Sequence, residues 1–251
     1  MPLPIFADFA IRLGGGLAAV LATTPWRVVP PRFFQTHCQV ILGLAVLATL
    51  VASRPPFQTS VFGLSLAGAA LAFAASIAWG LGLPRLGVPL AIAIAATSAV
   101  TLGLTAEGAG PAVWTLNAAS RLASAFLLGS TLTAMLLGHY YLTAPAMSIA
   151  PLRQFVGFMG GGLVVRAGLA ALAIGLLWSG MSGYGSISPL FLAIRWGMGI
   201  VGVGLATVLT WNTVKIRSTQ SATGILYIAM TLLLFGELSS LILARESHLT
   251  I

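Results

Sequence analysis

The sequence has very few charged side chains. Only 6% of its 251 residues are Asp, Glu, Lys or Arg, whereas about a quarter is usual in a soluble domain. Apolar residues make up 58% of the chain. So few charges are not enough to cover the surface of a soluble globule of this size. The composition therefore excludes a soluble domain and predicts a protein that lies in a lipid bilayer.

Cysteine and acidic residues are scarce as well. Cys38 is the only cysteine, so an internal disulfide, a covalently attached haem and a site with several cysteine ligands are excluded. The carboxylate side chains are too scattered for an Asp-rich magnesium site or for paired acid and base catalysis. They are Asp8, Glu107, Glu237 and Glu246.

Long apolar runs dominate the rest of the chain. A helix needs about 20 apolar residues to cross the roughly 30 Å hydrocarbon core of a bilayer. The sequence therefore predicts an all-α, polytopic transmembrane helical bundle of seven spans with no soluble domain. The bundle occupies residues 34–244, between an N-terminal segment, 1–33, and a short tail, 245–251. We place the spans near residues 34–53, 61–82, 86–105, 113–142, 154–178, 189–211 and 220–244.

The N-terminal segment is harder to assign. Residues 6–22 are apolar, but the run is short, contains Asp8 and Arg12, and is interrupted by three glycines at 14–16. We expect a segment that lies in the membrane interface or enters the bilayer only partway, with an eighth span as the alternative. Its headgroup anchors would be Trp26, Arg27 and Arg32.

The basic residues outside the spans predict an orientation, because cytoplasmic loops collect Lys and Arg. Seven of them fall on one side and two, Arg54 and Arg245, on the other. The loops before the first span and after the second, fourth and sixth spans are therefore expected in the cytoplasm, with the C-terminus outward, in an inner or plasma membrane. Nucleic-acid binding is not expected, because the charges are dispersed. The seven are Arg12, Arg27, Arg32, Arg85, Arg153, Lys215 and Arg217.

Two short motifs do not predict the chemistry with which they are associated. Residues 197–202 read GxGxxG, but the run lies inside a span and not between a strand and a helix, so we expect it to serve helix packing. Residues 180–183 resemble the GxSG motif of rhomboid proteases. Ser182 is predicted across the membrane from His37 and His139, so a glycine-serine loop is the preferred interpretation.

Two histidines suggest a cofactor. His37 and His139 are predicted about one turn inside the cytoplasmic face, on two different spans. Facing imidazoles at one depth can supply both axial ligands of a non-covalent, b-type haem. The sequence thus predicts an electron-transfer subunit of a larger membrane complex, in which Tyr140 lines the pocket or orients a quinone headgroup. The haem propionates would be held by Arg32, Arg153 and Arg217.

Other interpretations of these histidines stay open. Histidine is common at membrane interfaces, and both side chains can be explained by interfacial packing alone. A different metal, such as copper with Cys38 or Met147 as an additional ligand, is a further alternative. Partners are expected to be the lipid bilayer and other membrane or redox subunits.

Four charged residues fall deeper inside predicted spans. Charge is costly there, so each of them is a candidate for a functional role. Three are predicted in the outer half of the membrane, and Arg166 lies nearer the midplane. Three interpretations stay open: an ion pair that locks helices together, a pathway for an anion, proton or substrate, and pairing with a neighbouring subunit. The alternative functions are therefore a small transporter or channel, or a structural subunit of a membrane complex. The four residues are Arg121, Arg166, Arg195 and Glu237.

Overall fold

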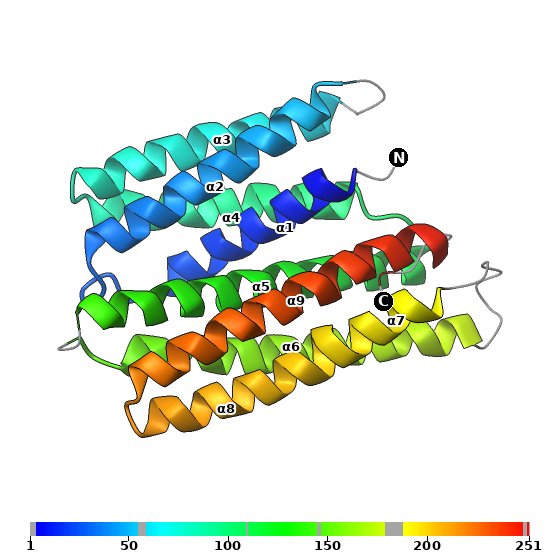
Figure 1. Cartoon of the computed structure of the whole chain (residues 1–251). Helices are drawn as coiled ribbons and strands as arrows, with labels where there is room; N and C mark the ends of the chain where they lie inside the picture. Colours follow the sequence, from blue (N-terminus) through cyan, green and yellow to red (C-terminus); the bar gives the residue numbers. More distant parts are fainter. Residues whose placement is uncertain are drawn as a thin grey trace.

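The computed structural model describes residues 4–54, 59–108, 110–144, 147–178, 188–247 and 250. Within these ranges the chain forms helices and no strand, which confirms the all-α prediction (Figure 1). Residues 180–183, which carry the GxSG sequence, lie outside the described ranges.

Eight helices of the described chain are long and apolar enough to cross a membrane, which fits an integral membrane protein. Four of them begin with a proline, whose missing N–H has no partner in the first turn of a helix anyway. The helices are α1 (Ile5–Thr23), α2 (Pro31–Ala52), α3 (Thr59–Gly80), α4 (Pro84–Leu104), α5 (Pro111–Thr143), α6 (Ala150–Trp178), the continuous rod of α7 (Pro189–Trp196), η1 (Gly197–Gly202) and α8 (Val203–Lys215), and α9 (Thr219–Ser247).

The helix α1 lies inside the bundle, where it packs against α2, α4 and α5. This arrangement fits the alternative of eight spans and differs from the expected interfacial segment. The glycines explain the difference, because they let two backbones touch. A Cβ at Gly16 would collide with the carbonyl oxygen of Ala125, and one at Gly129 would collide with the backbone of Gly16. Arg12 is accordingly buried in the bundle and not in a loop.

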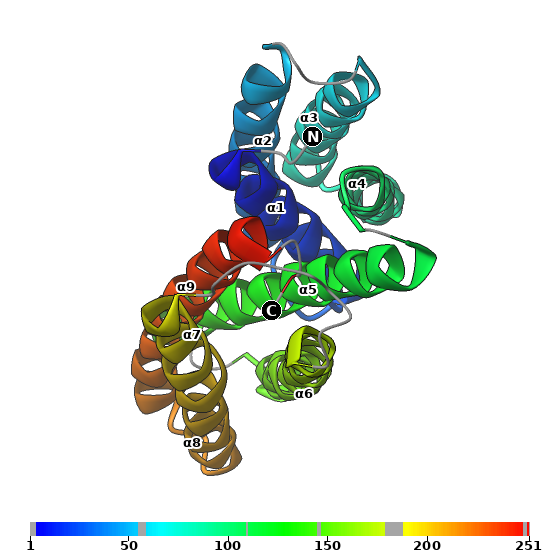
Figure 2. The same ribbon diagram turned by 90° about the vertical axis from the view of Figure 1, so that its right-hand side faces the viewer.

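The eight long helices form two rings of four. In the first ring, α1, α2, α3 and α4 each pack against the next, and α4 returns to α1. In the second ring, α5, α6, the α7–α8 rod and α9 do the same. The rings meet mainly where α1 packs along α5, as Figure 2 shows in a view rotated by 90° from Figure 1.

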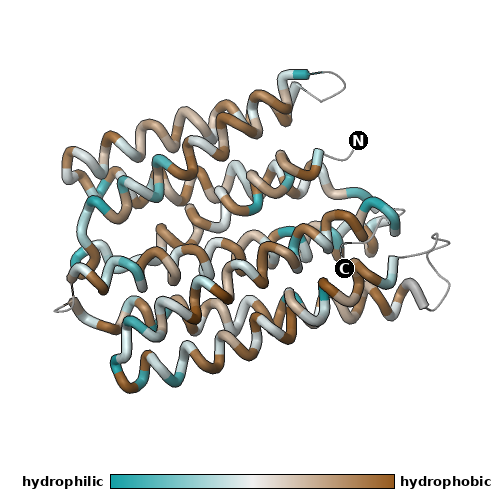
Figure 3. Tube along the Cα trace, in the orientation of Figure 1, coloured by the Kyte–Doolittle hydropathy of each residue, from teal (hydrophilic) through white to brown (hydrophobic). Residues whose placement is uncertain are grey.

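The two ends of the bundle differ in charge. The connections after α1, α3, α5 and α8 share one end, at the left of Figure 1, which we call the basic end. Figure 3 shows apolar residues along most of each helix and many of the polar ones near the helix ends. The basic end carries six cations of the connections and helix ends: Arg27, Arg32, Arg85, Arg153, Lys215 and Arg217.

The GxGxxG run serves helix packing, as predicted. Its residues form the π-helical turn η1, and Gly199 lies directly against Gly236 of α9. A Cβ on Gly199 would lie 2.6 Å from the Cα of Gly236 and 3.2 Å from Nη1 of Arg195. The missing side chain therefore gives room both to α9 and to a buried guanidinium.

Candidate functional site

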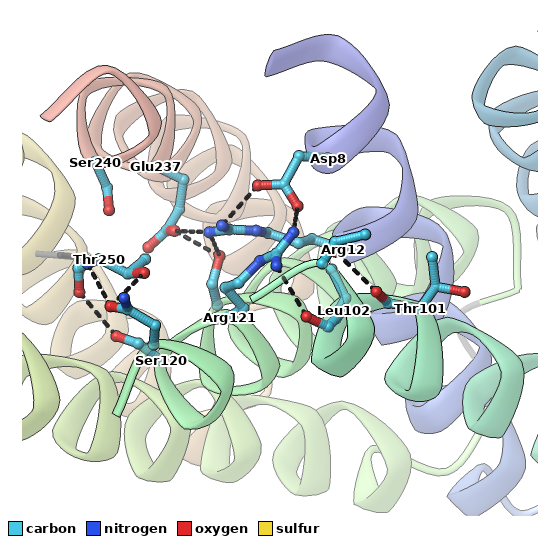
Figure 4. Close-up of polar contacts among 12 residues, drawn as sticks. Asp8, Arg12, Thr101, Leu102, Ser120, Arg121, Glu237, Ser240 and Thr250 are labelled. Carbon is cyan, nitrogen blue, oxygen red and sulfur yellow. Dashed lines mark hydrogen bonds and ion pairs between the residues drawn. The ribbon is translucent and has the colours of Figure 1, made fainter. Parts of the chain in front are cut away.

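Six ionisable side chains gather inside the bundle, in the half away from the basic end. They come from α1, α5, α6, α7 and α9, and all six residues are buried. Figure 4 shows four of them, Asp8, Arg12, Arg121 and Glu237, pointing toward one another between α1, α5 and α9. We call this set the charge cluster: Asp8, Arg12, Arg121, Arg166, Arg195 and Glu237.

Asp8 connects the first ring to the second. Its Oδ2 atom accepts a hydrogen bond of 2.7 Å from Nη2 of Arg12, one turn further along α1. Its Oδ1 atom accepts one from Nη2 of Arg121 in α5. Arg121 also donates to the carbonyl oxygen of Leu102 in α4, over 2.8 Å. One carboxylate and one guanidinium thus join three helices across the ring boundary.

Glu237 of α9 is the second centre of the cluster. Its Oε1 atom accepts hydrogen bonds from Nη1 of Arg195 at 2.8 Å and from Nε of Arg166 at 3.3 Å. Its Oε2 atom accepts one from the Ser124 hydroxyl at 2.5 Å and lies 4.0 Å from Nη1 of Arg12. Both oxygens are therefore engaged, and the second centre reaches α1 through Arg12.

Hydroxyl groups hold Arg166 in place. Its Nη2 atom donates to the Ser240 hydroxyl at 2.7 Å, and its Nη1 atom donates to the Ser120 hydroxyl at 2.8 Å. The same Nη1 atom lies 3.5 Å from the carbonyl oxygen of Thr250. This guanidinium is fully buried, and serine oxygens replace the water that would otherwise solvate it.

The cluster carries more positive than negative charge. Four guanidinium groups and two carboxylates leave a formal charge of +2. Four guanidinium nitrogens have no hydrogen-bond partner within the described chain. They are Nε of Arg12, Nε of Arg121, and Nε and Nη2 of Arg195. Buried cations are costly unless an opposite charge compensates them. Glu107, which lines the pocket beside Arg121, adds a negative charge at the edge of the cluster.

A pocket of about 110 Å³ reaches the cluster from the end opposite the basic end. Asp8, Arg12 and Arg121 line its inner part. Residues near the helix ends line the rest, namely Thr105, Glu107, Asn117, Leu241, Ala244, Arg245 and Thr250. At roughly 30 Å³ per molecule in the liquid, this space holds a few waters or one small solute.

The four intramembrane residues singled out in the sequence all lie in the cluster. Glu237 pairs with Arg195 and Arg166, whereas Arg121 pairs with Asp8. Sequence reasoning missed Asp8 and Arg12, because it placed their segment outside the bundle. Their spacing of four residues was the available signal, since opposite charges at this spacing face each other on a helix.

The structure does not bring the two histidines together as a pair. His37 is buried, its Nδ1 atom donates to the carbonyl oxygen of Phe33 at 2.7 Å, and its ring packs on that of Phe33. His139 is exposed, whereas Gly138 and Tyr141 beside it are buried. Tyr140 approaches the ring of Phe33, with centroids 6.4 Å apart. This geometry does not fit a haem held by both imidazoles.

The structure does not gather the other residues that were predicted to bind a cofactor into one site either. Arg32, Arg153 and Arg217 are exposed at the basic end. In the described part of the chain, no three His, Cys, Asp or Glu side chains are grouped as they would be to hold a metal ion. Cys38 is buried. The haem, the quinone and the copper site remain predictions from the sequence alone.

Comparison with models of protein families and with curated proteins gives no match. The functional assignment therefore depends on the geometry of the charge cluster and its pocket.

Proposed function

We propose that the protein is a membrane transporter that binds a small anion in the pocket of the charge cluster. The observation that carries this proposal is the excess of buried guanidinium groups over carboxylates, next to a pocket that leads to them. Ionisable residues inside membrane proteins commonly mark substrate or ion pathways.

Arg12 and Arg121 are the groups that would bind the anion. Both line the pocket, and the Nε atom of each lacks a hydrogen-bond partner in the described structure. Asp8 lies between them and holds both guanidinium groups in place through its two oxygens. In a site of low dielectric constant, fixed cations attract an anion far more strongly than they would in water. Asn117 and Thr105 add polar groups to the pocket.

The contact between α1 and α5 supports a carrier and not an open channel. Toward the basic end from the cluster, the backbones of these helices touch at Gly16 and Gly129. This contact would close the path between α1 and α5 toward the basic end. The walls of the pocket come from both rings. Asp8 and Arg12 belong to the first ring, and Thr105 directly follows α4 of that ring. Asn117, Arg121 and Arg245 belong to the second ring. Relative rocking of two halves around a central site is a common route to alternating access.

The same layout supports the orientation that we propose. Six cations lie at the basic end, whereas Arg54 and Arg245 lie at the opposite end. The positive-inside rule then puts the basic end in the cytoplasm and opens the pocket to the outside of an inner or plasma membrane. In this orientation the transporter would take its anion from the outer side.

A structural role for the cluster is the second candidate. Both carboxylates use both of their oxygens within the protein, as expected of ion pairs that lock helices together. On this view the pocket has no ligand, and the protein is a non-catalytic subunit of a membrane complex. The two candidates differ in whether any small anion binds.

Thermal unfolding of the detergent-purified protein separates them. Chloride, nitrate, acetate, phosphate and sulfate are compared at constant ionic strength, so that general screening is the same in each sample. We expect at least one of these anions to raise the Tm of the protein, and Arg121→Gln to remove this rise. Arg54→Gln is the control, because Arg54 is exposed and outside the cluster. Equal Tm values in all five salts would leave only the structural role.

A further inference from the structure

The indole ring of Trp211 holds two cations at the basic end. The Cζ atom of Arg153 and the Nζ atom of Lys215 each lie 5.7 Å from the centroid of this ring. Arg153 comes from the first turn of α6, and Lys215 lies one turn beyond Trp211 in α8. Each cation is attracted to the face of the ring. The two cations repel each other, however, so an anion shared between them would stabilise the arrangement.

The chain has no carboxylate side chain with which to neutralise this pair. Its four acidic residues all lie in the other half of the bundle: Asp8 and Glu237 in the charge cluster, Glu107 after α4, and Glu246 at the end of α9. No acidic side chain of the protein therefore competes with an external anion for Arg153 and Lys215. Both side chains are exposed, so such a molecule has access to them.

An exposed apolar stripe of α8 leads to the two cations. Leu205 and Val208 are 63% and 60% exposed. With Trp211 and Lys215 they follow a spacing of three, three and four residues, so all four lie on one face of the helix. In a bilayer the apolar part of this face touches acyl chains, and the half-buried Trp211 marks the level of the headgroups. The face thus changes from apolar to aromatic to cationic in the direction in which a lipid changes from chain to phosphate.

We propose that Arg153 and Lys215, held on the ring of Trp211, bind the phosphate of an anionic phospholipid whose acyl chain lies along the Leu205 and Val208 stripe of α8. The phosphate oxygens accept charge-assisted hydrogen bonds from both side chains. Cations on the cytoplasmic side of membrane helices are well suited to anionic headgroups. A free phosphate ion would use the cations but not the stripe, which is why the site fits a lipid better.

The test uses the full chain, purified and delipidated in a neutral detergent. Its Tm is measured with added phosphatidylglycerol, with phosphatidylcholine and with inorganic phosphate, and bound lipid is counted by native mass spectrometry. We expect phosphatidylglycerol to raise the Tm more than the other two and to remain bound. Arg153→Gln and Lys215→Gln should each lower this rise, and the double variant should lose most of it.

The matched control is Arg85→Gln, which removes the same charge from an exposed position at the same end, in the first ring. It should keep the full effect of phosphatidylglycerol. An equal loss in Arg85→Gln would mean a general surface field, and an equal rise with inorganic phosphate would mean a free-anion site; each result overturns the proposal. The site lies in the other half of the bundle from the charge cluster, so its double variant should still respond to the anion of the pocket.

Discussion

The carboxylate of Asp8 in α1 and the guanidinium of Arg121 in α5 form a buried ion pair that joins the two four-helix rings. The pair is next to the line where α1 and α5 run in contact, and its members also hold Arg12 and the end of α4. This one ion pair lines the pocket and joins the two rings. It also fixes Arg12 and Arg121, whose Nε atoms have no hydrogen-bond partner in the described structure.

Asp8→Asn should destabilise the protein strongly. The substitution leaves Arg12 and Arg121 buried beside a neutral amide, and the loss of one partner from a buried ion pair costs about 3–5 kcal/mol. Denaturant-induced unfolding in detergent micelles measures the change. Glu246→Gln is the control, since this carboxylate is exposed and accepts a hydrogen bond from the backbone N–H of Ser188. Equal stability of the two variants would show that the Asp8 pair is not formed.

Gly16→Ala should separate α1 from α5. The new Cβ would collide with the carbonyl oxygen of Ala125 and lie 3.2 Å from the backbone nitrogen of Gly129. Overpacking of this kind typically costs about 1–3 kcal/mol, which a lowered Tm reports. The matched variant Gly43→Ala has open space around its Cβ and should keep or raise the Tm, because alanine favours helix. A Gly16→Ala protein as stable as Gly43→Ala would argue against the contact.

Gly199→Ala should disturb the cluster at Arg195. Its Cβ would press on the Cα of Gly236 and on Nη1 of Arg195, the atom that donates to Glu237. We expect a lower Tm and a weaker response to the anion that stabilises the natural protein. Gly197→Ala, two residues earlier in the same π-helical turn, meets no atom within 4 Å and serves as the comparison. Identical anion responses in the two variants would show that Gly199 does not influence the charge cluster.

His139→Ala should leave the reduced-minus-oxidised absorption spectrum of the purified protein unchanged. His139 is exposed on α5, and His37 is buried against Phe33, so the structure shows no facing pair of imidazoles that would hold a haem. Loss of a b-type haem band in the variant would contradict this expectation and restore the electron-transfer hypothesis.

Most of the helices could be predicted from the sequence, because each requires only a local property. The apolar runs of α2 to α9 have the length of a bilayer, and prolines mark several of their first residues. The helix α1 was ambiguous because Asp8 and Arg12 lower its apolarity. Their burial is compensated by Arg121 and by Glu237, which are more than a hundred positions away. A local window of sequence cannot detect such partners.

Only part of the candidate site could be predicted, because the sequence gives the depth of a residue but not its distant partners. The depth of a residue follows from its count along a helix, so Arg121, Arg195 and Glu237 could be placed in one half of the membrane. The side of the helix on which a residue lies depends on the neighbouring helices. His37 and His139 were expected at one depth, but their directions depend on how α2 and α5 pack, which the sequence does not specify.

Uptake of anions by proteoliposomes is the most direct measurement of the central claim. The anion that raises the Tm is supplied outside vesicles that contain the natural protein, Arg121→Gln or Arg54→Gln. We predict uptake by the natural protein and by Arg54→Gln, and uptake at the level of protein-free vesicles for Arg121→Gln. Uptake that is the same for Arg121→Gln and the natural protein, or that is absent from both, would contradict transport through the charge cluster.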